Sequence, residues 1–231
     1  GGNADTVAGV QQTGGTIQNG TLTSTTAFDM QAGTASANLA GAVGLDKTTA
    51  GTTTLSGTNT YTGTTTVSAG NLNLNSAGTA IAGNLTVAGG TATLQAADQI
   101  ADGKNVVVTS GTLDVASFND TVNGVQITGG TITGTTGALT STTAFDLQAG
   151  TVSAILGGTA GANKTTAGTV TLSKTNTYTG ATTVSAGTLT LGHATNTLAD
   201  ASTVVVSGGT LDLGGNADTV AGVQQTGGTI Q

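Results

Sequence analysis

The 231-residue sequence contains no proline, cysteine or tryptophan. It also lacks glutamate and arginine, because its eleven acidic residues are all aspartate and its four cations are all lysine. The absence of cysteine excludes disulfides and thiolate metal sites. No stretch of about 20 apolar residues is present, so we expect no segment to insert into a membrane. With a net charge of −7 and no basic patch, nucleic acid is not an expected partner.

The residues that are present favour strands. Straight-chain helix formers are scarce, whereas threonine, which is β-branched, is abundant and 39 residues are glycine. Disorder is typical of high charge with low hydrophobicity, but here 6% of residues are charged and 36% are apolar. The composition therefore predicts an ordered all-β chain. Its start at Gly1, without methionine, is interpreted as the sign of a fragment or a processed product.

A long repeat runs through the chain. Residues 214–231 repeat residues 1–18, "GGNADTVAGVQQTGGTIQ", letter for letter, so the period is 213 residues. We interpret the chain as a window on a longer tandem array. Within one period, residues 1–115 and 116–213 are related, and residues 214–231 begin the next copy. The first half carries about 19 extra residues, close to "AGTAIAGNLTVAGGTATLQ".

A shorter repeat explains the size of that insertion. A glycine followed by a short alternating strand recurs every 18 to 22 residues, with eleven steps between Gly15 and Gly228 and a mean near 19.4. In "TVTL", Val170 and Leu172 share one face, as in a strand with one buried side. Coils of this length bury that side only by stacking, and a stack tolerates one extra unit.

This pattern predicts a single parallel β-helix over residues 1–231, with about 19 residues per coil and about 11–12 coils. Eleven steps of about 4.8 Å would span roughly 53 Å. The missing proline fits, because each strand must donate hydrogen bonds to a ladder. The alternative is an antiparallel sandwich or barrel, which would not readily absorb a lone 19-residue insertion.

One phrase carries a family resemblance. "GTVTLSKTNTYTGATTVSAGTLTLG" (168–192) and its counterpart at 51–75 resemble the passenger-associated transport repeat of bacterial autotransporter proteins. The resemblance covers about 50 residues closely. It implies a right-handed parallel β-helix, an extracellular or cell-surface location on Gram-negative bacteria, and a role of the repeat in passage across the outer membrane. Such passengers are typical of adhesins and other large surface proteins.

Aromatic residues are the first candidate sites. Tyr61 and Tyr178, the two tyrosines, occupy equivalent places in the phrase. They could stack on a sugar, but the favoured interpretation is a tyrosine packed at a corner with its hydroxyl bonded to the backbone. Phe28 and Phe145, in "TTAFD", are expected to fill the core.

The acids are candidate catalysts, since many β-helices cleave polysaccharides with paired carboxylates. Asp114 with Asp120, and Asp212 with Asp218, are pairs six residues apart. About five coils separate the two pairs, and no arginine could hold a substrate carboxylate. We therefore predict no catalytic residue and no enzyme.

The other polar motifs favour no cofactor and no metal. His193, whose counterpart is Ser76, is expected on a surface loop. "GGNAD" has its aspartate one place too early for a calcium-binding nonapeptide. "GGTAG" at 157–161 lacks the Lys-Ser/Thr of a phosphate loop. Lys47 and Lys164 are equivalent and are expected to be solvated.

Three functions remain open at this point. The leading hypothesis is a structural segment of a long extracellular β-helical fibre or adhesin stalk, whose partners are further copies of itself in tandem or stacked end to end. The second is an adhesin passenger that binds surface glycans or a receptor. The third is a polysaccharide-degrading β-helix enzyme.

Overall fold

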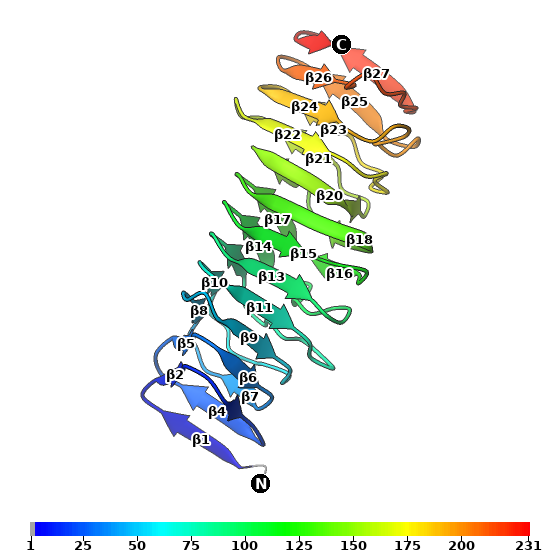
Figure 1. The fold of residues 1–231 in the computed structure, drawn as a ribbon. Coiled ribbons are helices and arrows are strands. Elements are labelled where there is room, and N and C mark those ends of the chain that lie inside the picture. The colour runs from blue at the N-terminus through cyan, green and yellow to red at the C-terminus, as the bar shows by residue number, and fades with distance from the viewer. Residues whose placement is uncertain (1–2) are drawn as a thin grey trace.

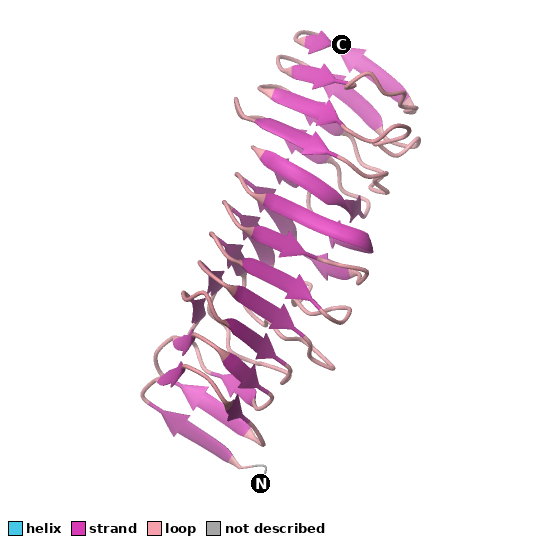
Figure 2. Ribbon diagram, in the orientation of Figure 1, coloured by secondary structure: helices cyan, strands magenta, loops and turns pink. Residues whose placement is uncertain are grey.

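The computed structural model describes residues 3–231, which form an elongated stack of coils with the two ends of the chain at opposite ends of the stack (Figure 1). Strands and loops make up the whole described chain, and no helix occurs in it (Figure 2). Every strand pairing in residues 3–231 is parallel, which confirms the predicted fold class and rules out the antiparallel alternative. About 12 coils of about 19 residues are stacked.

Two long sheets run the length of the stack. The first has twelve strands, one from each coil: β2 (Val10–Gln12), β5 (Phe28–Met30), β8 (Leu45–Lys47), β10 (Thr65–Val67), β12 (Leu85–Val87), β14 (Asn105–Val108), β17 (Gly124–Ile127), β19 (Phe145–Leu147), β21 (Ala162–Lys164), β23 (Thr182–Val184), β25 (Thr203–Val206) and β27 (Gly222–Gln225).

The second long sheet follows the first within each coil. Its strands are β3 (Thr16–Ile17), β6 (Gly33–Ala35), β9 (Thr52–Leu55), β11 (Asn71–Leu74), β13 (Thr91–Leu94), β15 (Thr112–Asp114), β18 (Thr131–Ser141), β20 (Gly150–Gly157), β22 (Thr169–Leu172), β24 (Thr188–Leu191), β26 (Thr210–Asp212) and β28 (Thr229–Ile230), with β16 (Asp120–Val122) beside β18.

Each coil has a third side, which lies between its strand in the second sheet and the next strand of the first sheet. This third side forms a regular sheet in only part of the stack. At the N-terminal end β1 (Ala4–Val7), β4 (Thr21–Ser24) and β7 (Asn38–Ala40) form a short sheet. In the middle, β16 and the ends of β18 and β20 continue it. Between these regions and near the C-terminus, the third side is loop, with isolated bridges at Ile81–Ile100 and Thr195–Ala217. There the backbone must find other hydrogen-bond partners.

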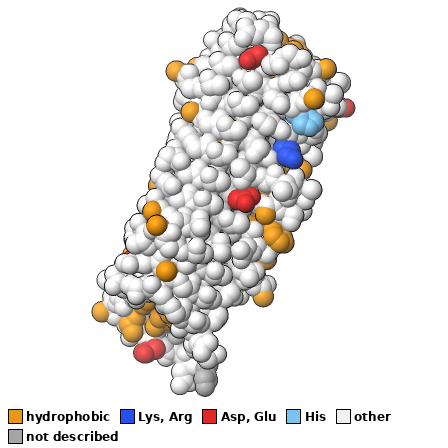
Figure 3. All heavy atoms as spheres, viewed as in Figure 1, with side chains coloured by type: hydrophobic (Ala, Val, Ile, Leu, Met, Phe, Trp, Pro, Cys, Tyr) orange, Lys and Arg blue, Asp and Glu red, His pale blue; other side chains and the backbone are white. Residues whose placement is uncertain are grey.

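The core is a continuous column of inward-pointing side chains. Strand β22 shows the predicted alternation, because Val170 and Leu172 are buried while Thr169 is exposed. Valine, leucine and isoleucine at such positions form one contiguous cluster through the stack. The outer surface is mostly uncharged and polar, with few charged side chains on the face shown in Figure 3. Burial of this column is the main stabilising term for stacking.

The extra residues of the first half form one whole coil, as predicted. Strand β12 lies between β10 and β14 in the first sheet, and β13 lies between β11 and β15 in the second. The neighbouring coils keep their register across the insertion. A solenoid accepts such an addition because each coil contacts only its neighbours.

Glycine is required at the corner that precedes the second sheet, since successive coils touch there. A Cβ added to Gly111 would lie 2.2 Å from the carbonyl oxygen of Gly90, and one added to Gly130 would lie 2.4 Å from that of Gly111. Gly130 also has a φ of 68°, a left-handed conformation. Any side chain at these corners would push adjacent coils apart.

Candidate functional site

The asparagine of the "NTYTG" phrase links three consecutive coils on the third side. Asn59 is 2% exposed. Its Oδ1 accepts from the backbone N–H of Leu39 in the preceding coil at 2.8 Å. Its Nδ2 donates to the carbonyl oxygen of Ala80 in the following coil at 2.7 Å. A neutral amide can do both because it carries a donor and an acceptor.

The second copy of the phrase repeats this arrangement. Asn176 is also 2% exposed, and its Oδ1 accepts from Leu156 N at 2.9 Å. Its Nδ2 donates to the carbonyl oxygen of Thr197 at 2.8 Å. The phrase therefore supplies, with a side chain, the hydrogen bonds that a regular third strand would have made.

Both tyrosines are buried, as favoured by the sequence, and neither exposes a ring face to a sugar. The predicted backbone acceptor is wrong, however. The hydroxyl of Tyr61 bonds the side-chain oxygen of Thr65 at 2.6 Å, and that of Tyr178 bonds Thr182 at 2.8 Å. The chain turns at this corner, so that the threonine four residues after each tyrosine reaches the phenol hydroxyl. Burial raises the pKa of both phenols.

The phenylalanines pack against these tyrosines and fill the core, as predicted. The ring centroids of Phe28 and Tyr61 are 6.0 Å apart, and those of Phe145 and Tyr178 are 5.9 Å apart. The rings are tilted by 55° and 51°, which is a favourable aromatic geometry. The two halves of the chain thus build the same aromatic cluster.

The prediction that Lys47 and Lys164 are solvated is wrong. Both side chains are inaccessible to solvent, and in the first sheet they point inward, paired in register with Val67 and Val184. Each Nζ bends to the corner between sheets and donates to backbone carbonyls of its own coil and of the next. Lys47 bonds Thr49 O and, at 3.3 Å, Ala69 O.

Lys164 makes the equivalent bonds to Thr166 O and, at 3.3 Å, Ala186 O. Burial lowers the pKa of Lys47 and Lys164, and the nearby carboxylates of Asp29 and Asp146 oppose that shift. The two ammonium groups therefore hold corner carbonyls together rather than offsetting surface charge.

The structure does not bring Asp114 and Asp120 together as a catalytic pair. Asp114 Oδ1 accepts from Ala116 N at 2.9 Å, within its own turn. Asp120 is 1% exposed, and its Oδ2 accepts from Gln99 N at 2.8 Å and Ile100 N at 3.1 Å in the preceding coil. Each carboxylate serves the backbone.

Burial also raises the pKa of Asp120 to about 7. The two backbone bonds lower it, and the charges of Asp98 and Asp102 raise it further. Oδ1 of Asp120 has no hydrogen-bond partner in the described chain. This carboxyl is therefore a buried structural group that links two coils through one of its oxygens.

The second aspartate pair behaves in the same way. Asp212 Oδ1 accepts from Gly214 N at 2.9 Å, and Asp218 Oδ2 accepts from Leu198 N at 3.1 Å. Burial raises the pKa of Asp218, which backbone bonds lower and the charge of Asp200 raises. Each of these carboxylates also bonds the backbone.

His193 lies on an exposed loop, as predicted, where its Nδ1 contacts the carbonyl oxygen of Thr195 at 2.5 Å. Within residues 3–231 no group of three or more potential metal ligands is assembled. The first "GGNAD" begins at residues 1–2, which lie outside the described residues. In the second, Asn216 Nδ2 donates to Leu191 O at 2.9 Å, so this turn binds the neighbouring coil. Gly158 of "GGTAG" lies at a corner with φ 114°.

The sequence reasoning missed the polar side chains that stitch the third side. Asn59, Asn176 and Gln99 were not predicted as buried, yet Gln99 Oε1 accepts from Ser76 N at 2.7 Å and its Nε2 donates to Ser76 O at 3.1 Å. A usable signal was present, because both copies of the phrase place an amide two residues before the buried tyrosine.

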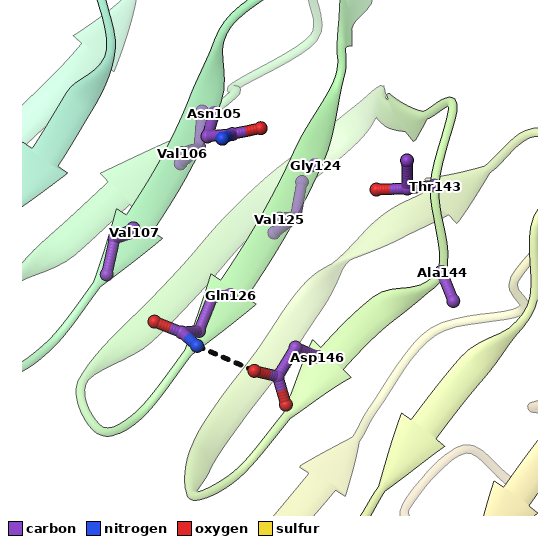
Figure 4. Close-up of a pocket in the computed structure, with 9 residues that line it drawn as sticks. All are labelled: Asn105, Val106, Val107, Gly124, Val125, Gln126, Thr143, Ala144 and Asp146. Atoms are coloured by element: carbon purple, nitrogen blue, oxygen red, sulfur yellow. Dashed lines mark hydrogen bonds between the residues drawn. The ribbon is translucent and has the colours of Figure 1, made fainter.

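Two grooves open on the outer face of the first sheet. The larger, with a volume of about 290 Å³, lies over β25 and β27 beside Gly222. The other lies beside Gly124 and has more polar side chains along it. It has a volume of about 230 Å³ and lies over β14, β17 and the start of β19, where Gly124 has no side chain (Figure 4). Gln126 Nε2 donates to Asp146 Oδ2 at 2.6 Å along its edge, and Gln148 Nε2 donates to the same oxygen at 2.8 Å. Asn105 and Thr143 complete the polar rim. The groove offers amides and a carboxylate, and its lining residues include neither a lysine nor a histidine.

The described chain contains no helix of the length and apolar character needed to cross a membrane.

A family model described as the passenger-associated-transport-repeat matches residues 45–74, 163–191 and 186–213. The first two matches contain the two "NTYTG" phrases, and the third covers the next coil, which the sequence analysis did not single out. Neither the curated proteins nor the solved structures contain a match. The three repeat matches lie on a solenoid of parallel strands. Both features fit a passenger β-helix of an autotransporter.

Proposed function

We propose that the chain is a structural segment of a long extracellular bacterial β-helical fibre or adhesin stalk, in which 213-residue copies follow one another. The observation that carries the proposal is the match between the repeat and the coils. Residues 10–12 form β2 and their copies 223–225 lie in β27, while residues 16–17 form β3 and their copies 229–230 form β28. One period therefore comprises eleven whole coils.

A period of whole coils has a mechanical consequence. The next copy begins on the same sheets with the same faces inward, so the ladders and the apolar column can continue without a break. A stiff rod of constant width is the expected result. The matching repeat is typical of autotransporter passengers, and this supports a secreted or cell-surface location.

The test is the length of rods built from one, two and three tandem 213-residue copies. We expect the long axis, measured by small-angle X-ray scattering and electron microscopy, to grow by about 53 Å per copy at constant cross-section, from eleven coils of about 4.8 Å. Compact particles, or beads joined by flexible joints, would contradict a stalk.

A second candidate is glycan binding by the groove over Gly124. Its amide and carboxylate edge, Gln126 with Asp146, has the chemistry that hydrogen-bonds sugar hydroxyls. Glycan-array binding by the intact chain that is lost in Gln126→Ala, but kept in Gln95→Ala on an exposed loop, would support it. The polysaccharide-degrading alternative has no such observation in the described residues.

A further inference from the structure

The groove beside Gly124 lies between two rows of polar side chains that run along the stack. One row stands where the strands of the first sheet begin. Asn84 Oδ1 accepts from Asn105 N at 3.0 Å, and Asn105 Oδ1 accepts from Asn123 Nδ2 at 2.8 Å. Thr142 Oγ1 donates to Asn123 Oδ1 at 3.4 Å. Four consecutive coils contribute to this row, which is called the asparagine row below.

The second row lies two residues farther along the strands. Gln126 Nε2 and Gln148 Nε2 both donate to Asp146 Oδ2, at 2.6 Å and 2.8 Å. One carboxylate oxygen is thus shared by two amides. Among residues 3–231, no hydrogen bond is made by the other oxygen, Asp146 Oδ1, or by Gln126 Oε1. Both atoms are therefore available as acceptors.

The floor between the rows is small and apolar. Val107 of β14 and Ala144 line it, and Gly124 adds no side chain. A Cβ on Gly124 would lie 3.0 Å from both Asn105 Oδ1 and Thr143 Oγ1, so these two oxygens flank the glycine (Figure 4). A sugar ring has C–H groups on its faces and hydroxyl groups around its edge. An apolar floor between polar sides matches that pattern.

The charge of the groove selects among sugars. Asp146 is the one charged residue in its lining, and the chain as a whole carries a net charge of −7. A carboxylate accepts hydrogen bonds from hydroxyl groups but repels another carboxylate or a sulfate. The groove therefore suits a glycan without acidic groups.

The groove in the other half of the chain lacks the asparagine row. It lies beside Gly222, the counterpart of Gly124. There Thr203 replaces Asn105, and Ala221 replaces Asn123. A threonine and an alanine cannot form the row of linked amides, so the two grooves differ on one side while they share the same floor.

The second row also recurs without the asparagine row. Gln11 and Gln31 both donate to Asp29 Oδ2, at 2.8 Å each, as their counterparts do at Asp146. The residue equivalent to Asn123 is Ala8 in this copy. In the described chain the two rows therefore occur together at a single place, around Gly124.

We propose that the groove between the asparagine row and the Gln126–Asp146 row is a binding site for a neutral glycan. The inference rests on the glycan-binding candidate proposed above, and adds which sugars the groove accepts and which side chains decide it. Asn105 Nδ2, which donates no hydrogen bond in residues 3–231, would donate to a sugar oxygen. Asp146 Oδ1 would accept from a sugar hydroxyl while the ring lies on Val107.

The test compares neutral and acidic sugars on the full chain. The probe is an array of neutral oligosaccharides, each printed beside its sialylated, sulfated or uronic-acid derivative. We expect binding to neutral members, at one site per chain by calorimetry, and binding to the acidic derivatives that is at least tenfold weaker. Acidic derivatives that bind as well as neutral members would overturn the proposal alone. An array without any bound member would overturn the glycan candidate too. The rod length of tandem copies depends on neither result.

Two matched substitutions locate the site. Gly124→Ala places a methyl group 3.0 Å from Asn105 Oδ1 and Thr143 Oγ1, and should weaken binding at least tenfold. Gly222→Ala is the control, because its Cβ would meet only Thr203 Cγ2, at 4.0 Å, and binding should not change. Asn105→Thr installs the residue that the other half carries, so the coil should fold, and binding should weaken about tenfold. Unchanged binding in Gly124→Ala or in Asn105→Thr would overturn the site.

A second pair of variants tests the selection by charge. Asp146→Asn should narrow the difference between neutral sugars and their acidic derivatives. Asp29→Asn is closely matched, since Asp29 also accepts from two glutamines and also lies near a buried lysine, and the difference should persist. A difference that is the same in both variants would show that Asp146 does not select the sugar, and this result would overturn the proposal.

Discussion

Two regions of the third side perform the same task with different chemistry. Around Asn176 a neutral amide accepts from the coil before it and donates to the coil after it. Around Asp120 a carboxylate accepts two N–H groups from the coil before it, and its second oxygen is buried without a partner. The amide therefore links three coils without introducing a charge. The carboxylate links two coils and makes the junction sensitive to pH.

The largest expected effect comes from breaking the amide link. Asn176→Ala leaves the N–H of Leu156 buried without a partner, at a cost of about 1–3 kcal/mol, and removes the second of two bonds to Thr197 O, which keeps the backbone N–H of residue 176 and loses about 1 kcal/mol. We expect a loss of roughly 4 kcal/mol in urea unfolding, with faster hydrogen exchange at Leu156. Asn71→Ala, on an exposed asparagine, is the control and should be nearly neutral. Equal losses in both variants would contradict the role assigned to the amide.

The next effect is a change in pH dependence at the carboxylate. The folded chain holds a proton on Asp120 up to about pH 7, whereas the unfolded chain releases it near its ordinary pKa of 3.8. Between those values the folded state binds more protons, so stability falls as pH rises from about 4 to about 7. Asp120→Asn should flatten that fall and stabilise the chain at pH 8 by about 2–4 kcal/mol.

Thermal unfolding between pH 4 and 8 measures this difference. Asp102→Asn, on an exposed acid near the same site, is the matched control and should keep most of the slope. A slope that survives Asp120→Asn unchanged would place its origin elsewhere.

A smaller change in the pH dependence of stability is expected at the buried ammonium groups. Their charge is opposite to that of Asp120, so the slope should have the opposite sign. Because burial lowers the pKa of Lys164, the unfolded chain binds more protons between the lowered value and 10.5, and stability should rise with pH in that window. Lys164→Met keeps the apolar packing and should remove the rise, and the melting temperature at pH 7 should fall slightly because Thr166 O and Ala186 O lose their Nζ donor. Lys174→Met, on the more exposed neighbouring loop, should leave the rise intact.

The smallest effect tests the tyrosine beside the amide. Tyr178→Phe removes one hydrogen bond to Thr182 but keeps the ring against Phe145, so we expect a loss of about 1 kcal/mol. Thr182→Val and the double variant complete a cycle, and a coupling energy near zero would show that the bond is not the cause. Tyr61→Phe should behave alike in the first half.

Much of the fold could be predicted because its signals are local and repeated. Alternation within "TVTL" placed Val170 and Leu172 inside, and the 19-residue insertion appeared as one coil. The alternation of "LDK" also places Lys47 on the same inward face as Leu45. The expectation that a lysine is solvated overrode that pattern, and it failed because a long side chain can reach carbonyls at a corner.

The candidate site was harder to predict, because its contacts join residues about 20 apart in the sequence. Nothing local to Asn59 shows that its amide lies between Leu39 and Ala80. The acceptor of the Tyr61 hydroxyl likewise depends on how the corner turns toward Thr65. These partners are set by the register of neighbouring coils.

The sequence by itself determined the solenoid, its coil length and the number of coils in a period, since period-two alternation and corner glycines recur at fixed spacing. It also determined that the two ends are copies of each other. Only the tertiary structure decided which polar side chains are buried and what Asn176, Asp120 and Lys164 bond. The physical reason is that a buried polar group takes its partners from the coils above and below, which stacking alone brings into reach.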